Sequence, residues 1–155
     1  MENRARNNTN QQVISELNQY VVFKIHEEEY GIDIQKITTI EKLLNITRVP
    51  KAPEAVRGVV NLRGEIIPVV ELAHKLRMKQ SKATDDTRII IFKIEDISVG
   101  FIVDEVVEVL SIPTEQIENA TQVSTDVTID YIFGIGKVEE RIVTLLNLEK
   151  LIVIK

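Results

Sequence analysis

The feature of this sequence that most restricts its fold is an internal repeat in two parts. The first part aligns residues 21–40 with residues 90–109 without a gap, so that Phe23 falls on Phe92 at an offset of 69 positions. In the same frame, three more residues fall on identical ones: Lys24, Ile25 and Gly31 on Lys93, Ile94 and Gly100. Alternating Val and Ile residues can align by chance, but four matched positions in one frame favour a duplication.

The second part of the repeat is a hairpin-like stretch later in each half. The run VRGVVNLRGEIIPVVEL aligns with IFGIGKVEERIVTLLNL when Gly58 is placed on Gly134, and Leu72 then falls on Leu148. Each half therefore has the same order: a two-strand unit, a loop, and a hairpin that begins after a glycine and closes on a leucine.

The repeated segments favour an all-β fold with short helices. Short runs of Val, Ile and Phe alternate with polar residues and end at Gly, Pro or Asp, which predicts many short strands. No long helical stretch follows each strand, as a parallel sheet would need, so two similar small β-barrels are expected. Both copies change from period two to period three at Gln35-Lys36 and at Asp104-Glu105, which predicts a bulge or a break there. Brief helical turns are expected at 53–56, 71–76 and 113–117.

The distribution of polar residues predicts how these parts are organised. Residues 1–13 are rich in Asn, Gln and Arg and are expected to form a disordered tail. Residues 14–155 are expected to form a single domain built from two β-barrel subdomains at about 20–76 and 88–152. The polar stretch MKQSKATDD, at residues 78–86, is the expected linker between them.

Composition argues against several classes of protein. A net charge of −5, scattered basic residues and 5% aromatic residues are unlike a nucleic-acid-binding surface. No apolar run approaches the roughly 18 residues of a membrane span, and no secretory signal is visible, so a cytoplasmic protein without direct membrane insertion is expected. The chain has no cysteine, which excludes disulfides, a thiolate nucleophile and cysteine-ligated metals.

A search for catalytic or cofactor-binding residues finds no coherent set. The two histidines, His26 and His74, lack the spacing of a metal pair or of a base beside a nucleophile. The glycines before Lys137 suggest a phosphate loop, but Val138 stands where the loop needs a hydroxyl group. No catalytic residue, metal or cofactor is therefore expected, and the chain is expected not to be an enzyme.

The hairpin at residues 58–72 differs between the copies at its turn. Arg63 and Gly64 are matched by two glutamates in the second half, while Pro50 and Pro53 stiffen the approach to the first hairpin. A stiff approach and a glycine turn would hold Arg63 in a fixed direction, which suits a contact with a partner. A plain surface turn remains the alternative. Pro68 lacks an N–H group and is expected to end strand pairing on one side of the hairpin.

The same segments resemble the CheW family of coupling proteins in bacterial chemotaxis, from Tyr20 to the C-terminus. The runs that carry the resemblance are YGIDIQKI, ITRVPKAP, VRGVVNLRGEIIPVVEL, RIIIFKI, GFIVDEVVEVL and YIFGIGKVEERIVTLLNLEKL. The resemblance implies two intertwined, SH3-like β-barrel subdomains of about five strands each. It also implies a non-catalytic adaptor that couples transmembrane chemoreceptors to the histidine kinase CheA, recruited from the cytoplasm to signalling arrays at the membrane.

The resemblance also implies two groups of partner-binding residues. The surface for the regulatory domain of CheA would include Ile34, Ile37, Thr39 and Glu41. The surface for coupling to the cytoplasmic tip of the receptor would include Arg57, Gly58, Asn61, Leu62, Arg63 and Arg88. Two positions depart from the family pattern, because Thr39 stands where an acidic residue is common and Arg88 where an apolar residue is common.

Two other interpretations stay open. Within the same fold, the chain could be a CheW-like regulatory domain of CheA or the adaptor half of CheV, although the Met1 start and short polar tail favour a free-standing adaptor. From a different class, an OB-like barrel would bind single-stranded nucleic acid with strong salt dependence.

Overall fold

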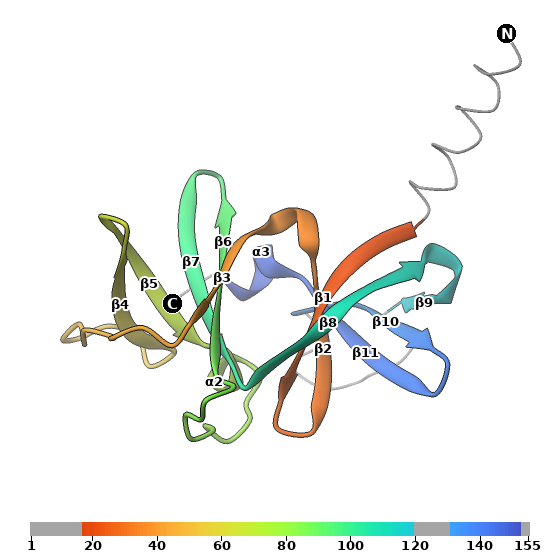
Figure 1. The fold of residues 1–155 in the computed structure, drawn as a ribbon, viewed down its shortest axis with the longest axis horizontal. Coiled ribbons are helices and arrows are strands. Elements are labelled where there is room, and N and C mark those ends of the chain that lie inside the picture. The colour runs from red at the N-terminus through yellow and green to blue at the C-terminus, as the bar shows by residue number, and fades with distance from the viewer. Residues whose placement is uncertain (1–16, 120–130, 153–155) are drawn as a thin grey trace, which may run out of the picture.

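The computed structural model describes residues 17–119 and 131–152, and the tail expected at residues 1–13 lies outside this part of the chain. The described residues form strands joined by turns and short helices (Figure 1). The strands are β1 (Leu17–Ile25), β2 (Glu28–Asp33), β3 (Ile37–Lys42), β4 (Val56–Leu62), β5 (Glu65–Glu71), β6 (Arg88–Ile94), β7 (Ile97–Val103), β8 (Glu105–Pro113), β9 (Ile117–Asn119), β10 (Ile132–Val138) and β11 (Arg141–Leu146). The helical segments are α2 (Leu72–Lys75), α3 (Leu148–Leu151) and the 3-10 turns η1 (Ile34–Lys36) and η2 (Thr114–Gln116).

The strands build two sheets, which confirms the all-β fold with short helices. One sheet has six strands in the order β8-β1-β2-β11-β10-β9, and the other has five in the order β3-β6-β7-β5-β4. The two sheets lie side by side, with the five-stranded sheet on the left of Figure 1. We expected about five strands in each; the sixth is β9, which pairs with β10 from Gly134 to Gly136.

Each sheet takes strands from both halves of the repeat, so the sheets are intertwined. The two-strand unit β1–β2 of the first half joins the hairpin β10–β11 of the second half, and the unit β6–β7 joins the hairpin β4–β5 of the first half. The two sheets therefore do not coincide with the expected subdomain boundaries of 20–76 and 88–152, because each sheet contains strands from both ranges. Residues 76–87, which include the expected linker, hold no helix or strand.

The strand registers carry the repeat into three dimensions. Gly31 pairs with Leu145 where β2 meets β11, and Gly100 pairs with Val69 where β7 meets β5, both in parallel ladders. These are equivalent pairs at the two sequence offsets. Bulges recur as well: the register shifts between Val56 and Gly58 and, at the matching place in β10, between Ile132 and Gly134. β4 and β10 also bury their residues in the same alternating pattern. The duplication is thus also visible in the fold.

Most of the expected local features are present. The change from period two to period three at Gln35-Lys36 falls in the turn η1. The change at Asp104-Glu105 falls at a one-residue break between β7 and β8. Helix α2 forms within residues 71–76, and η2 forms within 113–117. Residues 53–56 were expected to be helical but form a turn, because Val56 N donates to Pro53 O and the chain then enters β4. The ladder from β5 to β7 begins at Val69, so Pro68 ends strand pairing on that side as expected.

The largest hydrophobic core lies between the two halves rather than inside one of them. It joins residues of β1 and β2 to residues of β6 and β7, and it buries both Leu72 of α2 and Leu148 of α3 completely or nearly so. This explains why each hairpin of the repeat closes on leucine. Two smaller cores lie within the individual sheets, around Val60 and Ile67 in one and around Val22 and Ile112 in the other.

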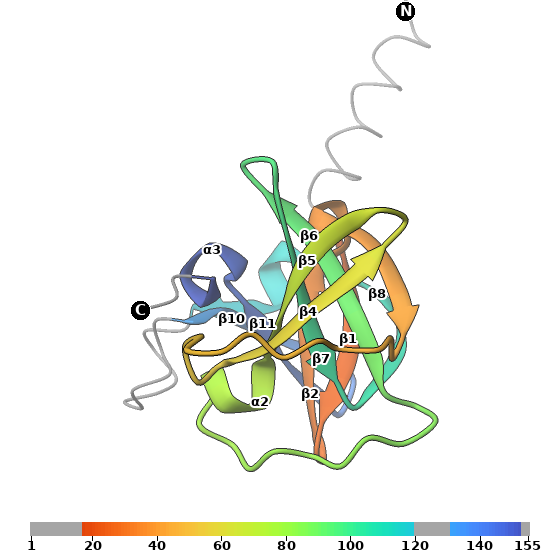
Figure 2. The ribbon, with the colours of Figure 1, turned by 90° about the vertical axis from the view of Figure 1, so that its left-hand side faces the viewer.

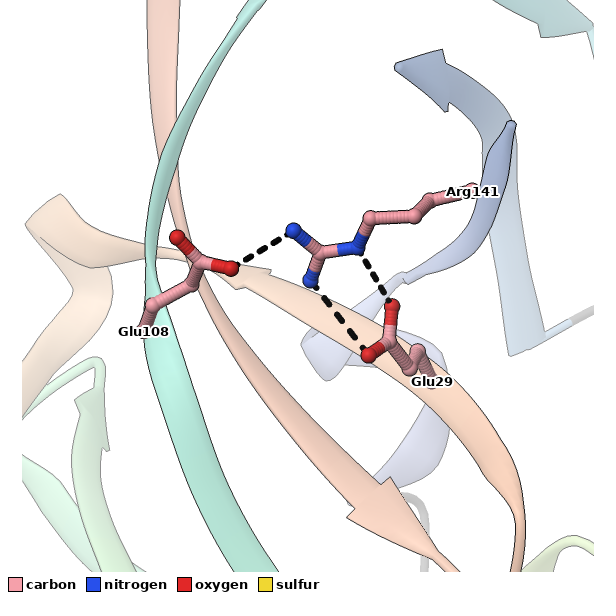
Figure 3. A network of polar contacts seen from close by, with 3 residues as sticks. All are labelled: Glu29, Glu108 and Arg141. Carbon is pink, nitrogen blue, oxygen red and sulfur yellow. Dashed lines mark hydrogen bonds and ion pairs between the residues drawn. The ribbon is translucent and has the colours of Figure 1, made fainter. Parts of the chain in front are cut away.

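A three-residue ionic network ties together strands of the six-stranded sheet (Figure 3). Arg141 at the start of β11 lies 3.1 Å from Glu29 on β2 and 2.6 Å from Glu108 on β8. These hydrogen bonds raise the pKa of Arg141. Strands β1 and β2 stand between β8 and β11 in the sheet, so a side-chain bridge across them requires the sheet to curl.

Candidate partner-binding site

Arg63 stands at the tip of the hairpin β4–β5, on a turn with a well-defined backbone. Both turn residues have positive φ, 53° for Arg63 and 87° for Gly64, as type I′ two-residue hairpin turns require. Asn61 Oδ1 accepts a hydrogen bond of 3.0 Å from Gly64 N, and Leu62 packs against the core of the five-stranded sheet. The Arg63 side chain is 77% exposed, so a fixed backbone presents an exposed guanidinium group to solvent.

Glu41 on β3 connects the two groups of residues that the sequence suggested. Its Oε2 accepts a hydrogen bond of 2.8 Å from Thr39 Oγ1 and lies 3.9 Å from Arg63 Nη2. Thr39 and Glu41 are only partly exposed, and Glu41 retains 19% of its side-chain surface. The hairpin tip and β3 therefore form one continuous polar surface, which we call the tip surface (Thr39, Glu41, Asn61 and Arg63).

Ile34 and Ile37 lie at the other end of β3 from Glu41. Ile34 begins η1 and Ile37 begins β3, and both are half-buried. Ile37 packs against the large core between the halves, so it serves the fold as well as the surface. These two residues thus lie beside the tip surface along β3 rather than within it.

Arg57 lies at the opposite end of β4 from Arg63, on the bulge. Six residue steps of extended chain place it roughly 20 Å from Arg63. Its Nη1 lies 3.1 Å from Oε2 of Glu71, whose side chain is only 8% exposed. Burial raises the pKa of Glu71 above its ordinary value, and the neighbouring Arg57 partly opposes this rise. The predicted receptor-coupling residues of this hairpin are therefore divided between its two ends, and Arg88 lies apart from them on β6.

Gly58 and Arg88 have structural partners of their own. A Cβ atom on Gly58 would collide with the backbone of Thr47, so the glycine lets the segment before β4 run against that strand. Figure 2 shows this segment crossing in front of the five-stranded sheet. Arg88 begins β6, and its Nη1 donates 2.8 Å hydrogen bonds to the carbonyl oxygens of Asp85 and Thr87.

Sequence reasoning missed Glu71 as a residue of this site. The available signal was a glutamate at the end of the apolar run IIPVV, where the second half has Asn147. A buried acid at the end of a strand indicates a cationic partner nearby, and the sequence alone did not show that this partner is Arg57. Phe133 holds the position in the second half that is equivalent to Arg57. Sequence reasoning did not predict that this aromatic side chain would be 57% exposed.

Within residues 17–119 and 131–152, no three His, Asp or Glu side chains gather closely enough to hold a metal ion. No helix in this part of the chain has the length and apolar character needed to cross a membrane.

Comparisons with known proteins decide the family. The sequence model of the CheW-like domain matches residues 19–154. The chain belongs to the CheW family. Chemotaxis protein CheW of Bacillus subtilis is 38% identical over 130 residues, covering 82% of this chain and 81% of that protein. Chemotaxis protein CheW of Klebsiella aerogenes is 34% identical over 134 residues, covering 86% of this chain and 81% of that protein.

A solved CheW structure agrees with the fold described above. The crystal structure of the scaffolding protein TtCheW from Thermoanaerobacter tengcongensis superposes with a TM-score of 0.82 and 35% sequence identity. It covers 90% of this chain and 94% of that chain. The expected function is thereby confirmed at the level of a chemotaxis adaptor. The CheV alternative has weaker support, since CheV3 of Helicobacter pylori is 25% identical and is matched over only 42% of its length.

Proposed function

We propose that this CheW-family protein couples transmembrane chemoreceptors to the histidine kinase CheA without catalysing a reaction itself. The tip surface carries this proposal, because it presents an exposed arginine on a rigid turn next to a shielded carboxylate. Such a surface can orient a partner by charge while β3 provides apolar contacts beside it. Recruitment to receptor arrays at the membrane follows from binding the receptor.

We assign the residues along β3 to the regulatory domain of CheA. Ile34 and Ile37 would provide the apolar part of the contact and Thr39 and Glu41 the polar part. Thr39 stands where the family commonly has an acid, and its hydroxyl group holds Oε2 of Glu41 at 2.8 Å. Glu41 therefore supplies a carboxylate beside the position where the family's acid is missing.

We assign the hairpin residues Arg57, Gly58, Asn61, Leu62 and Arg63, together with Arg88 at the start of β6, to receptor coupling. Because the hairpin tip contacts Glu41, a partner that moves the tip also alters the surface on β3. Binding at one surface then changes affinity at the other by the same factor in both directions. This reciprocal linkage is how receptor state would reach the kinase.

The test combines binding with kinase output. The protein is immobilised and offered a chemoreceptor cytoplasmic fragment and CheA separately, and CheA autophosphorylation is then measured with all three components mixed. Retention of both partners and a change in kinase output are expected. The proposal is wrong if neither partner is retained and CheA activity is the same with and without this protein. Binding of single-stranded DNA that weakens steeply with salt would support the OB-like alternative instead.

A further inference from the structure

A cavity of about 320 Å³, lined by both charged and apolar side chains, lies between the Arg57 end of the hairpin and the segment that joins the two halves. The hairpin β4–β5 contributes Arg57 of β4 and Glu71, the last residue of β5. The joining segment contributes Gln80, Ser81, Lys82, Ala83 and Thr87, and the rest of the lining comes from Leu43, Ile102 and Asp104. The cavity therefore has two basic and two acidic side chains around it.

The acidic groups of the cavity are already engaged within the chain. Glu71 Oε2 accepts from Arg57 Nη1 at 3.1 Å. Asp104 Oδ2 accepts from the backbone N of His26 at 2.7 Å and from the Ser81 hydroxyl group at 2.8 Å. Both carboxylates thus already accept hydrogen bonds within the chain, so neither needs a bound cation to stabilise it.

The basic groups of the cavity retain unused donors. The Arg57 side chain is 42% exposed and uses one nitrogen for Glu71, although a guanidinium group has five N–H donors. Lys82 is exposed and forms no ion pair within the described part of the chain. Lys82 is thus a cation of the cavity without a carboxylate partner in the described residues, and Arg57 has spare N–H donors beside it, which favours an anionic ligand.

A second cavity, of about 310 Å³, lies at the corresponding end of the hairpin β10–β11 and is lined by residues of both halves, so the two hairpin ends can be compared. In the second cavity the counterparts of Arg57 and Glu71 are Phe133 and Asn147. The bulge and the short helix form in both halves, so neither requires an ion pair. Burying the carboxylate of Glu71 costs free energy. Because the uncharged residues Phe133 and Asn147 occupy the same backbone positions in the second half, the fold alone does not explain why Glu71 is buried.

We propose that the cavity binds an acidic side chain of the receptor, with Arg57 and Lys82 as donors and Glu71 as a positioning residue. This inference rests on the proposed function and names the chemistry at its receptor-coupling surface. Glu71 holds one edge of the guanidinium group, so the other edge faces the cavity in a fixed orientation. A carboxylate then accepts charge-assisted hydrogen bonds from Arg57 and Lys82 without displacing Glu71.

The experiment measures the affinity of the full chain for a chemoreceptor cytoplasmic fragment and for the CheA regulatory domain. The variants are Arg57→Gln, Lys82→Ala and their combination, and the control is Lys137→Ala, which removes the same charge from an exposed pair with Glu118 on the other sheet. We expect about a tenfold loss of receptor affinity for each cavity variant. The double variant should lose less than the product of the single effects, because both donors contact one carboxylate. CheA binding and the control should remain at the wild-type level.

Glu71→Gln tests the positioning role. It should weaken receptor binding about threefold to tenfold when Arg57 is present and should have no further effect in the Arg57→Gln background. An equal loss in both backgrounds would show a general structural effect and would overturn the role given to Glu71.

The outcomes separate the two proposals. If the wild-type chain binds no receptor fragment, the proposed function and this inference both fail. If the wild type binds and the cavity variants bind equally well, only this inference is overturned. Acetate at the concentration of the fragment should not compete with it; competition at that level would assign the cavity to a small anion and would overturn the assignment to a receptor side chain.

Discussion

Thr47 and Val59 exchange two backbone hydrogen bonds of 2.8 Å, N to O in each direction. This single bridge holds the segment before β4 against the outer edge of that strand. It depends on the neighbouring Gly58, where a side chain would meet the Thr47 carbonyl group. An edge that would otherwise be open for pairing is thereby covered.

The first prediction concerns Gly58. Gly58→Ala should lower the free energy of unfolding by about 2–4 kcal/mol, because backbone rather than a flexible side chain occupies the space of the new Cβ. Gly64→Ala is the matched comparison, since it has positive φ but no atom within 4 Å, and it should cost about 1 kcal/mol. Urea denaturation measures both. A smaller loss for Gly58→Ala than for Gly64→Ala would contradict the close approach.

The second prediction concerns the network in Figure 3. Arg141→Met should lower the free energy of unfolding by about 1–2 kcal/mol, because Glu29 retains only 19% exposure and loses its cation. The Lys137–Glu118 pair is exposed on both sides, so Lys137→Met should cost less than about 0.5 kcal/mol. Thermal and urea unfolding provide the values. Equal losses would mean that the network does not tie the curled sheet together.

The third prediction concerns pH and Glu71. Burial raises its pKa in the folded state, so between the unfolded and folded pKa values the folded protein binds more protons than the unfolded chain. The contribution of Glu71 to stability is therefore full at acidic pH and is lost as pH rises through its folded pKa. Glu71→Gln should lose this dependence, so its unfolding free energy should rise relative to wild type between about pH 4.5 and neutral pH. A constant difference over that range would contradict the raised pKa.

The fourth prediction concerns Arg63. Arg63→Ala should change the free energy of unfolding by less than about 0.5 kcal/mol, because the side chain is 77% exposed and its contact with Glu41 is 3.9 Å long. Receptor-dependent control of CheA should nevertheless be lost in a kinase assay. Arg77→Ala is the control, since Arg77 is also an exposed arginine with positive φ, and it should leave kinase control intact. Lost stability with unchanged kinase control would instead make Arg63 a structural residue.

The sequence predicted those parts of the fold that repeat. The offset that aligns Gly31 with Gly100, and the offset that aligns Val69 with Leu145, reappear as equivalent strand pairs. The missing N–H group of Pro68 was enough to predict the end of strand pairing there, and the change of apolar period was enough to predict the strand breaks. The strand exchange between the halves came from the family resemblance, because alternating apolar residues specify a buried face but not which strand lies beside it.

The candidate site was only partly accessible from sequence. The turn chemistry of Arg63 and Gly64 indicated a fixed, exposed arginine, and the structure agrees. The contacts of Glu41 with Arg63 and of Arg57 with Glu71 link residues 22 and 14 positions apart, and they depend on how the sheet curls and where the bulge falls. Neither can be derived from residue spacing alone.

The exchange of strands between the halves also sets the order in which the chain can fold during synthesis. The five-stranded sheet needs β7, which ends at Val103, and the six-stranded sheet needs β11, which ends at Leu146. The first half therefore leaves the ribosome with its hairpin and its two-strand unit lacking their neighbours. Both must wait for sequence that has not yet been translated, so the nascent chain holds exposed strand edges for most of its synthesis.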